Sequence, residues 1–144
     1  MSHAAEATKT GSGDPDLLWK TLARIDGLEQ WMPNLVARCS VEGRGAGATR
    51  NLTLVDGAEL SEAILEIDEA ARRFRYAVAS HPFPARNIVG LISVDVQESG
   101  DVTVTWGAEF EIDEDIVEQV KQMMAGFYSA AIDALFDHCA EAAQ

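Results

Sequence analysis

The apolar residues of this chain change their spacing near residue 113, and that change restricts the folds open to it. Between residues 36 and 110, apolar and polar residues alternate, as they do in strands that bury one face. Turn-forming residues interrupt the alternation at 43–47, 56–57, 68–72 and 99–101. From residue 113 the spacing becomes three or four, which is typical of one face of a helix. We therefore predict successive antiparallel hairpins covered by one long helix.

The last three predicted strands have one apolar and one polar face. Their apolar positions are Phe74, Tyr76, Val78, Ile88, Ile92, Val94, Val96, Val102, Val104, Trp106 and Phe110. The final helix is predicted from residue 113 to about 142, with Asp113 as its N-cap and a length of roughly 40 Å. Its predicted apolar stripe consists of Ile116, Val120, Met123, Phe127, Ala131 and Leu135. Such a helix is long enough to cross the whole apolar face of the sheet.

Two short helices are predicted near the N-terminus. Asp14 and Pro15 form a helix start, and apolar residues recur at helical spacing until Gly27. A second short helix or turn follows at 28–35, with Trp31 as an apolar wedge. We interpret residues 1–13 as a candidate edge strand, from a weak pattern at 5–10, and residues 14–144 as one domain. A chain of 144 residues and 15.6 kDa has the size of a single ordinary domain.

Charge and composition exclude several kinds of partner. Eleven Lys and Arg against 24 Asp and Glu give a net charge of -13, so the overall field repels nucleic acid and anionic lipid surfaces. The sequence shows neither a secretory signal nor an apolar stretch long enough to span a bilayer, so we expect a cytoplasmic protein without membrane insertion. Cys39 and Cys139 have no metal-ligand spacing and are expected to be reduced thiols.

Short motifs follow one another in a fixed order between residues 28 and 76. They are Trp31-Met32-Pro33, residues 47–50, Asp56-Gly57, Glu62, Asp68 and residues 73–76. Their order and spacing resemble the START-like, or SRPBCC, superfamily, which includes polyketide cyclase-like proteins, lipid carriers, Bet v 1-type allergens and plant abscisic-acid receptors. The resemblance implies an α+β helix-grip fold, in which a curved antiparallel sheet of about six to seven strands wraps around a long C-terminal helix, with two short helices near the N-terminus. Because this fold hosts carriers, enzymes and protein-binding modules, it does not by itself assign a function.

The space between sheet and helix has two interpretations. Gly126 beside Met123, Met124 and Phe127 fits either a ligand cavity or a filled core in which helix and sheet approach closely. The residues alone slightly favour the filled core, whereas the resemblance favours the cavity. The candidate ligand-binding residues are Arg50, Glu62, Tyr76, Phe83, Ile92, Trp106, Phe110, Met123 and Phe127.

Arg50 and Glu62 form the sharpest polar hypothesis. If the hairpin at Asp56-Gly57 closes with a three-residue loop, the two residues lie opposite each other on neighbouring strands. Simple alternation turns Glu62 outward, as half of a surface ion pair, whereas a bulge near Ile64-Leu65 turns it inward. Both alternatives stay open. In related ligand-binding members, the resemblance implies, the matching pair organises water and polar ligand groups.

Two loops resemble the gate and latch of the hormone-receptor branch. They are residues 55–59 and residues 80–86, the second with Phe83 as an apolar tip between two prolines. Plain hairpin connections are the alternative interpretation. The lysine that the receptors carry before their Cys-Ser-Val stretch is Ala37 here, which argues against abscisic acid as a ligand.

Catalytic signatures are weak in this sequence. His3, His81 and His138 are far apart, and the chain lacks a GxSxG elbow, a Walker loop and an HExxH helix, so we predict no metal and no cofactor. The expected function is binding of a small hydrophobic molecule of lipid, polyketide or aromatic type. One alternative is a polyketide cyclase or dehydratase-like enzyme with Glu62 as acid-base catalyst, and another is a protein-interaction module. The sequence does not decide whether the protein is an enzyme, and it permits homodimerisation without requiring it.

Overall fold

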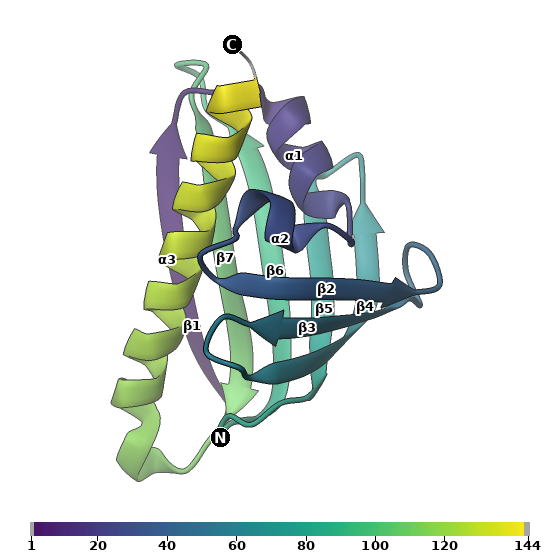
Figure 1. Ribbon diagram of the computed structural model, residues 1–144. Helices are drawn as coiled ribbons and strands as arrows, with labels where there is room; N and C mark the ends of the chain where they lie inside the picture. The colour runs from purple at the N-terminus through teal and green to yellow at the C-terminus, as the bar shows by residue number, and fades with distance from the viewer. Residues whose placement is uncertain (1, 143–144) are drawn as a thin grey trace.

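A seven-stranded antiparallel sheet forms the body of the molecule in the computed structural model, which describes residues 2–142 (Figure 1). The strands are β1 (Ser2–Gly11), β2 (Val36–Glu42), β3 (Thr49–Leu54), β4 (Glu59–Asp68), β5 (Arg73–Ser80), β6 (Arg86–Val96) and β7 (Val102–Glu111). Their order across the sheet is β1-β7-β6-β5-β4-β3-β2. The helices are α1 (Pro15–Ala23), α2 (Leu28–Trp31), a 3-10 turn η1 (Glu114–Ile116) and the long α3 (Val117–Ala142).

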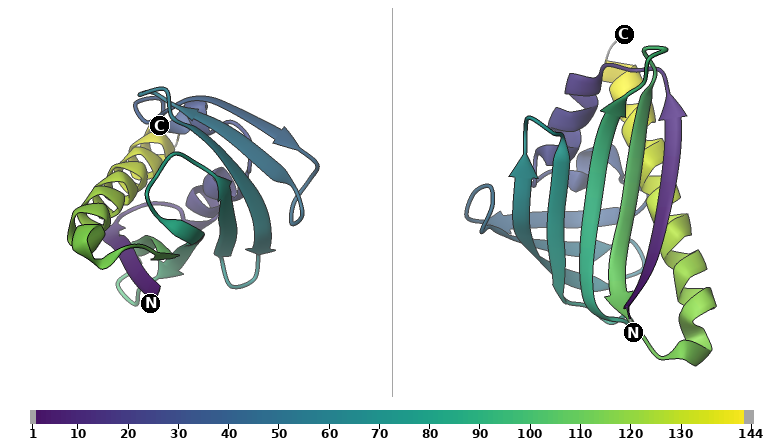
Figure 2. Two further views of the ribbon diagram at one scale, coloured as in Figure 1. Left: turned by 90° about the horizontal axis from the view of Figure 1, so that it is seen from below. Right: turned by 180° about the vertical axis from the view of Figure 1, so that it is seen from behind.

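The sheet curves, and α1, α2 and α3 all lie on its concave side (Figures 1 and 2). Helix α3 runs along this side, and α1 packs near its C-terminal end. This arrangement confirms the predicted helix-grip fold. It also divides the interior into an end closed by α1 and α2 and an end near the start of α3.

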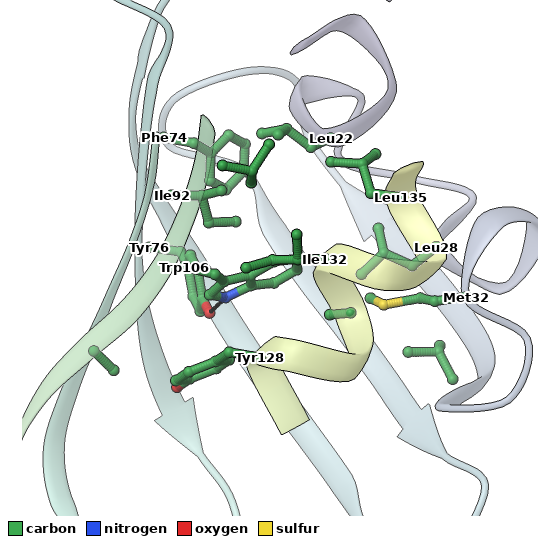
Figure 3. Packing of buried hydrophobic residues seen from close by; sticks show 14 of the residues in the cluster. Leu22, Leu28, Met32, Phe74, Tyr76, Ile92, Trp106, Tyr128, Ile132 and Leu135 are labelled. Carbon is green, nitrogen blue, oxygen red and sulfur yellow. Dashed lines mark hydrogen bonds between the residues drawn. The ribbon is translucent and has the colours of Figure 1, made fainter. Parts of the chain in front are cut away.

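The closed end is filled by a tightly packed apolar core (Figure 3). The alternation predicted for β5 to β7 places Phe74, Ile92 and Val104 inside, each at most 2% exposed. Val96 departs from the prediction, because it lies at the end of β6 and is 50% exposed. Apolar side chains from α1 and α3 meet these strands, among them Leu18, Leu22, Ile132 and Leu135.

Strand β4 contains the irregularity on which the orientation of Glu62 depends. The pairing of β4 with β5 shifts between Ile64 and Glu66, so that Leu65 is an extra residue in the ladder and is exposed. Glu62 and Ile64 consequently both face the interior. The hairpin before β4 has the expected three-residue loop, since the Leu54 N–H donates to the Ala58 carbonyl. The surface-pair alternative for Glu62 is therefore wrong.

Helix α3 buries a face that only partly overlaps the predicted one. Its buried residues are Val117, Val120, Tyr128, Ala131, Ile132, Leu135 and Cys139. Met123 is 50% exposed and Gly126 is exposed, with no side chain or strand of the described chain within 4 Å of a Cβ built there. Close approach of helix and sheet at Gly126 is thus excluded. The predicted stripe is confirmed at Val120, Ala131 and Leu135, and Ile116 and Phe127 are partly buried against the core. It is wrong at Met123, and it lacks Tyr128, Ile132 and Cys139.

The ends of the predicted helices also need correction. Helix α1 ends at Ala23, short of Gly27, and α2 is a single turn. The Asp113 side chain makes no capping bond within residues 2–142, because a 3-10 turn precedes α3. Residues 2–11 form β1, which pairs with β7 along its whole length. The candidate edge strand is thus present, and His3 lies in it beside Phe110.

Candidate functional site

A cavity of about 280 Å³ lies between the sheet, the first half of α3 and two loops. Its wall is predominantly apolar and contains four aromatic rings. The lining residues are Leu35, Leu54, Val55, Asp56, Leu60, Tyr76, Val78, Phe83, Ala85, Ile88, Val120, Met123, Met124, Phe127 and Tyr128. Asp56 is the only lining residue with a carboxylate, and the lining contains neither lysine nor arginine. The cavity therefore offers an environment for an uncharged apolar molecule.

Two loops border this cavity. The β3–β4 loop contributes Val55 and Asp56, and the β5–β6 loop contributes Phe83 and Ala85. In the second loop the Phe83 N–H donates to His81 Nδ1 at 3.1 Å, and the two rings stack with centroids 5.4 Å apart. The prolines on either side of Phe83 restrict the backbone further. These contacts hold Phe83 at the cavity in a defined position.

Tyr76, Trp106 and Tyr128 form an aromatic group that joins the cavity to the core (Figure 3). Trp106 Nε1 donates to Tyr76 Oη at 2.9 Å, and the Tyr128 ring stacks on Trp106 with centroids 6.0 Å apart. Burial raises the pKa of the Tyr76 phenol well above its ordinary value, and the neighbouring Tyr128 and Glu62 add to the shift. Burial likewise raises the pKa of Tyr128, with a further contribution from the Glu62 carboxylate. Both phenols are consequently neutral at physiological pH.

Gly90 provides the space that the Tyr76 ring occupies. The two residues are direct partners on β5 and β6, and a Cβ atom at position 90 would lie 2.2 Å from Tyr76 Cζ. Any other residue there would displace the ring. Gly90 therefore fixes the position of the Tyr76 hydroxyl.

Arg50 and Glu62 form a buried ion pair next to this aromatic group. Arg50 Nε and Nη2 both lie 2.7 Å from Glu62 Oε1, and Arg50 Nη1 donates to the Ile25 carbonyl at 3.3 Å. The guanidinium also lies over the rings of Phe74 and Tyr76, at 5.5 and 5.7 Å from their centroids. The pair thus contacts the rings of Phe74 and Tyr76, and neither Arg50 nor Glu62 is among the residues that line the cavity.

The structure brings together some of the predicted ligand-binding residues and separates others. Tyr76, Phe83, Met123 and Phe127 line the cavity. Arg50 and Glu62 are buried beside it. Ile92, Trp106 and Phe110 belong to the packed core and do not appear among the lining residues.

Sequence reasoning missed Tyr128, which is central to the site. The signal was present in the helix, because Val117, Val120, Met124 and Tyr128 are spaced by three, four and four residues. Met124 also lines the cavity and was assigned no ligand contact. Tyr128 was omitted from the predicted apolar face because its neighbour Phe127 was assigned to that face instead.

Other hollows and clusters offer less for a small-molecule site. A larger hollow of about 700 Å³ runs along β2–β4, but no aromatic side chain is among its lining residues, which include Ser40, Asn51 and Ser61. Among residues 2–142, no group of three or more His, Cys, Asp or Glu side chains is arranged to hold a metal ion. Within the same described part, none of the helices is long and apolar enough to cross a membrane.

The curved sheet, the long helix and the apolar cavity between them define a helix-grip protein. Solved structures share this fold over nearly the whole chain. XoxI from Bacillus cereus is 23% identical, with a TM-score of 0.79, and the match covers 100% of this chain and 97% of the XoxI chain. Ginseng major latex-like protein 151 from Panax ginseng is 16% identical, with a TM-score of 0.84, and the match covers 96% of this chain and 98% of the ginseng chain. A norcoclaurine synthase mutant from Thalictrum flavum, in complex with a transition-state analogue, is 15% identical, with a TM-score of 0.82. The match covers 100% of this chain and 98% of the synthase chain.

The sequence itself gives the family. Residues 2–144 match the model of the polyketide cyclase/dehydrase and lipid transport family, and the chain belongs to that family. No curated protein matches it. The family and the fold indicate a protein that binds hydrophobic ligands.

Proposed function

We propose that this protein binds a small hydrophobic molecule in the cavity between the sheet and α3. The observation that carries the proposal is the cavity itself, whose wall is almost entirely apolar and aromatic. Its volume of about 280 Å³ lies just below the roughly 300–1,000 Å³ that small-molecule sites usually have. This size favours a compact molecule of two or three rings over a long-chain lipid.

The flexible part of the wall supports the same proposal. Met123 and Met124 are unbranched and polarizable, so they adapt to ligands of different shape. Met123 is half-exposed although it belongs to the wall, which places it at the cavity rim. A protein-interaction module with a filled interior has weaker support, because the interior is not filled.

The enzyme alternative, in which Glu62 acts as acid-base catalyst, also has weaker support. Glu62 Oε1 already accepts two N–H groups of Arg50, and Glu62 is not among the residues that line the cavity. A general base must lie within hydrogen-bond reach of the proton it removes. We therefore assign Arg50 and Glu62 the role of holding Phe74 and Tyr76 in place.

Charge and cysteine chemistry support a proposal for the compartment and the partners. Cys39 and Cys139, the two cysteines of the chain, are both free, which fits a reducing compartment. The net charge of -13 disfavours nucleic acid as a partner. We propose that the protein works in the cytoplasm as a small-molecule binder.

Fluorescence titration with N-phenyl-1-naphthylamine, a neutral apolar dye, tests the proposal. The dye should bind with a saturating rise in fluorescence. Ile88→Phe should weaken binding because Ile88 is a buried part of the cavity wall, whereas Val89→Phe should not, because Val89 lines a separate hollow formed by β1 and β5–β7. The two substituted positions are neighbours in one strand, and their side chains lie on opposite faces of the sheet.

Native mass spectrometry of the purified protein complements the titration. A bound apolar compound that is released on denaturation would support the proposal and identify the ligand. Failure of the dye to bind, or equal loss of binding in both variants, would contradict it.

A further inference from the structure

The hydroxyl groups of Tyr76 and Tyr128 are the buried polar groups of the cavity wall, and their hydrogen bonds have a fixed direction. Trp106 Nε1 carries a hydrogen and can only donate, so Tyr76 Oη is the acceptor in the bond between them. The proton of the Tyr76 hydroxyl is therefore still available to an acceptor. The Tyr128 hydroxyl points to the same side as that of Tyr76 (Figure 3).

Counting donors and acceptors shows that this group is incomplete. Trp106, Tyr76 and Tyr128 together supply three hydrogens. If Trp106 donates to Tyr76 and Tyr76 donates to Tyr128, the Tyr128 proton is left over; if Tyr76 donates into the cavity, its own proton needs an acceptor there. In either arrangement one hydroxyl proton remains for a group outside the three side chains. Polar hydrogens in an apolar enclosure are costly when they have no partner.

The protein offers few acceptors for this proton. The charge of the Glu62 carboxylate contributes to the raised pKa of both phenols, and both Arg50 contacts are with Glu62 Oε1. Within residues 2–142, no hydrogen bond joins either Glu62 oxygen to a tyrosine. Asp56, the carboxylate of the cavity wall, belongs to the β3–β4 loop at the border of the cavity. A ligand in the cavity is thus well placed to accept the proton.

We infer that the cavity recognises a neutral, compact aromatic molecule through one acceptor oxygen, such as a ketone or quinone carbonyl, which takes the proton offered by Tyr76 and Tyr128. This inference rests on the proposed function and specifies its ligand class. The aromatic requirement comes from the rings of Phe83, Phe127 and the two tyrosines in the wall. An anionic ligand is disfavoured because the lining residues within 2–142 include no lysine or arginine, and the buried Arg50 is already paired with Glu62. A cationic ligand is disfavoured because Asp56, the carboxylate of the wall, lies in the loop at the cavity border, away from the two phenols.

Two probes of the same shape separate hydrogen bonding from apolar contact. 2-Acetonaphthone carries a carbonyl oxygen, and 2-isopropenylnaphthalene has a methylene group in its place. Their affinities can be measured by displacement of N-phenyl-1-naphthylamine from the wild type and from Tyr128→Phe and Tyr76→Phe. At least one of these variants should lower the affinity for the ketone about three- to tenfold, the net worth of one hydrogen bond, and leave that for the hydrocarbon within about twofold.

A third probe and a matched variant control the interpretation. 2-Naphthoate, an anion of similar size, should bind more weakly than the ketone because no cation in the wall receives it. Met124→Leu changes the wall without adding or removing a hydrogen-bonding group, so it should change both neutral affinities together. The carbonyl stretch of the ketone bound to the wild type should lie at lower frequency than in an alkane, and this measurement needs no variant.

The outcomes distinguish the inference from the proposal beneath it. If both neutral probes bind and neither tyrosine variant changes the ketone-to-hydrocarbon ratio, the proton goes to a group of the protein and the inference is wrong. An unshifted carbonyl stretch, or tighter binding of the naphthoate, would overturn it as well. If neither neutral probe nor the dye binds, the proposed function fails together with the inference.

Discussion

Replacing Glu62 with glutamine should destabilise the protein far more than breaking an ion pair at its surface. Arg50 and Glu62 are 3% and 5% exposed, so the variant leaves an uncompensated cation in the interior. Removing one partner of a buried pair generally costs about 3–5 kcal/mol. Glutamine keeps an oxygen that can accept from Arg50, and Arg50 retains the Ile25 carbonyl and two aromatic faces. We therefore expect a loss near the lower limit, about 3 kcal/mol.

Guanidinium chloride unfolding at neutral pH measures this loss, and thermal unfolding should show a fall in Tm of roughly 6–12 °C for a chain of this length. Asp95→Asn is the matched control. Its pair with Arg73 also joins neighbouring strands, at 2.8 Å, but both side chains are at least 35% exposed. A surface pair of this kind contributes about 0–1 kcal/mol.

The double variant Arg50→Met/Glu62→Leu completes the test. Because it removes both charges and fills the site with apolar atoms, its stability should lie close to that of the wild type or above it. Glu62→Gln costing no more than Asp95→Asn would refute the reasoning. A double variant whose loss of stability equals the sum of the losses in Arg50→Met and Glu62→Leu, measured singly, would also refute it, because the two charges would then be independent.

Three further results are expected. Gly90→Ala should lower stability by about 1–3 kcal/mol in denaturant unfolding, because its Cβ would overlap the Tyr76 ring. Gly126→Ala, on the exposed side of α3, should raise stability by up to about 1 kcal/mol, and a loss of equal size in both variants would contradict the steric argument. Tyr76 and Tyr128 are the two tyrosines of the chain, and the pKa of each is raised above 10. Phenolate absorbance should therefore stay low in the folded protein above pH 10, while stability falls because the unfolded chain ionises first; a rise at pH 10 without unfolding would show exposed phenols.

Whereas the pairing of β1 with β7 joins distant segments, the succession of hairpins from β2 to β7 and the long helix were predictable because period and turn chemistry are local properties of the sequence. Gly57 illustrates this point, since its positive φ of 94° closes the three-residue loop that sets Arg50 opposite Glu62. The inward direction of Glu62 was harder to predict. It depends on the bulge at Leu65, which simple alternation does not register.

The cavity wall was only partly predictable because it depends on how α3 is rotated about its axis. Met123 and Phe127 were recognised, whereas Tyr128 was missed. Successive side chains of a helix point about 100° apart, and the wall includes the adjacent pairs Met123–Met124 and Phe127–Tyr128, so a single narrow stripe of predicted positions finds only part of it. The role of Gly90 could not be foreseen at all, because it requires the register between β5 and β6.

The separation of the interior into a closed end and a cavity end bears on how such a protein can diversify. The close packing that holds the fold together is concentrated near α1 and the C-terminal half of α3, around Leu18 and Leu135. The cavity wall draws instead on two loops and on the first half of α3. Substitutions at Phe83 or Met123 can accumulate with little loss of stability, because these side chains are only partly packed. New ligand preferences can thus arise by changing one end of the molecule while the other end preserves the native state.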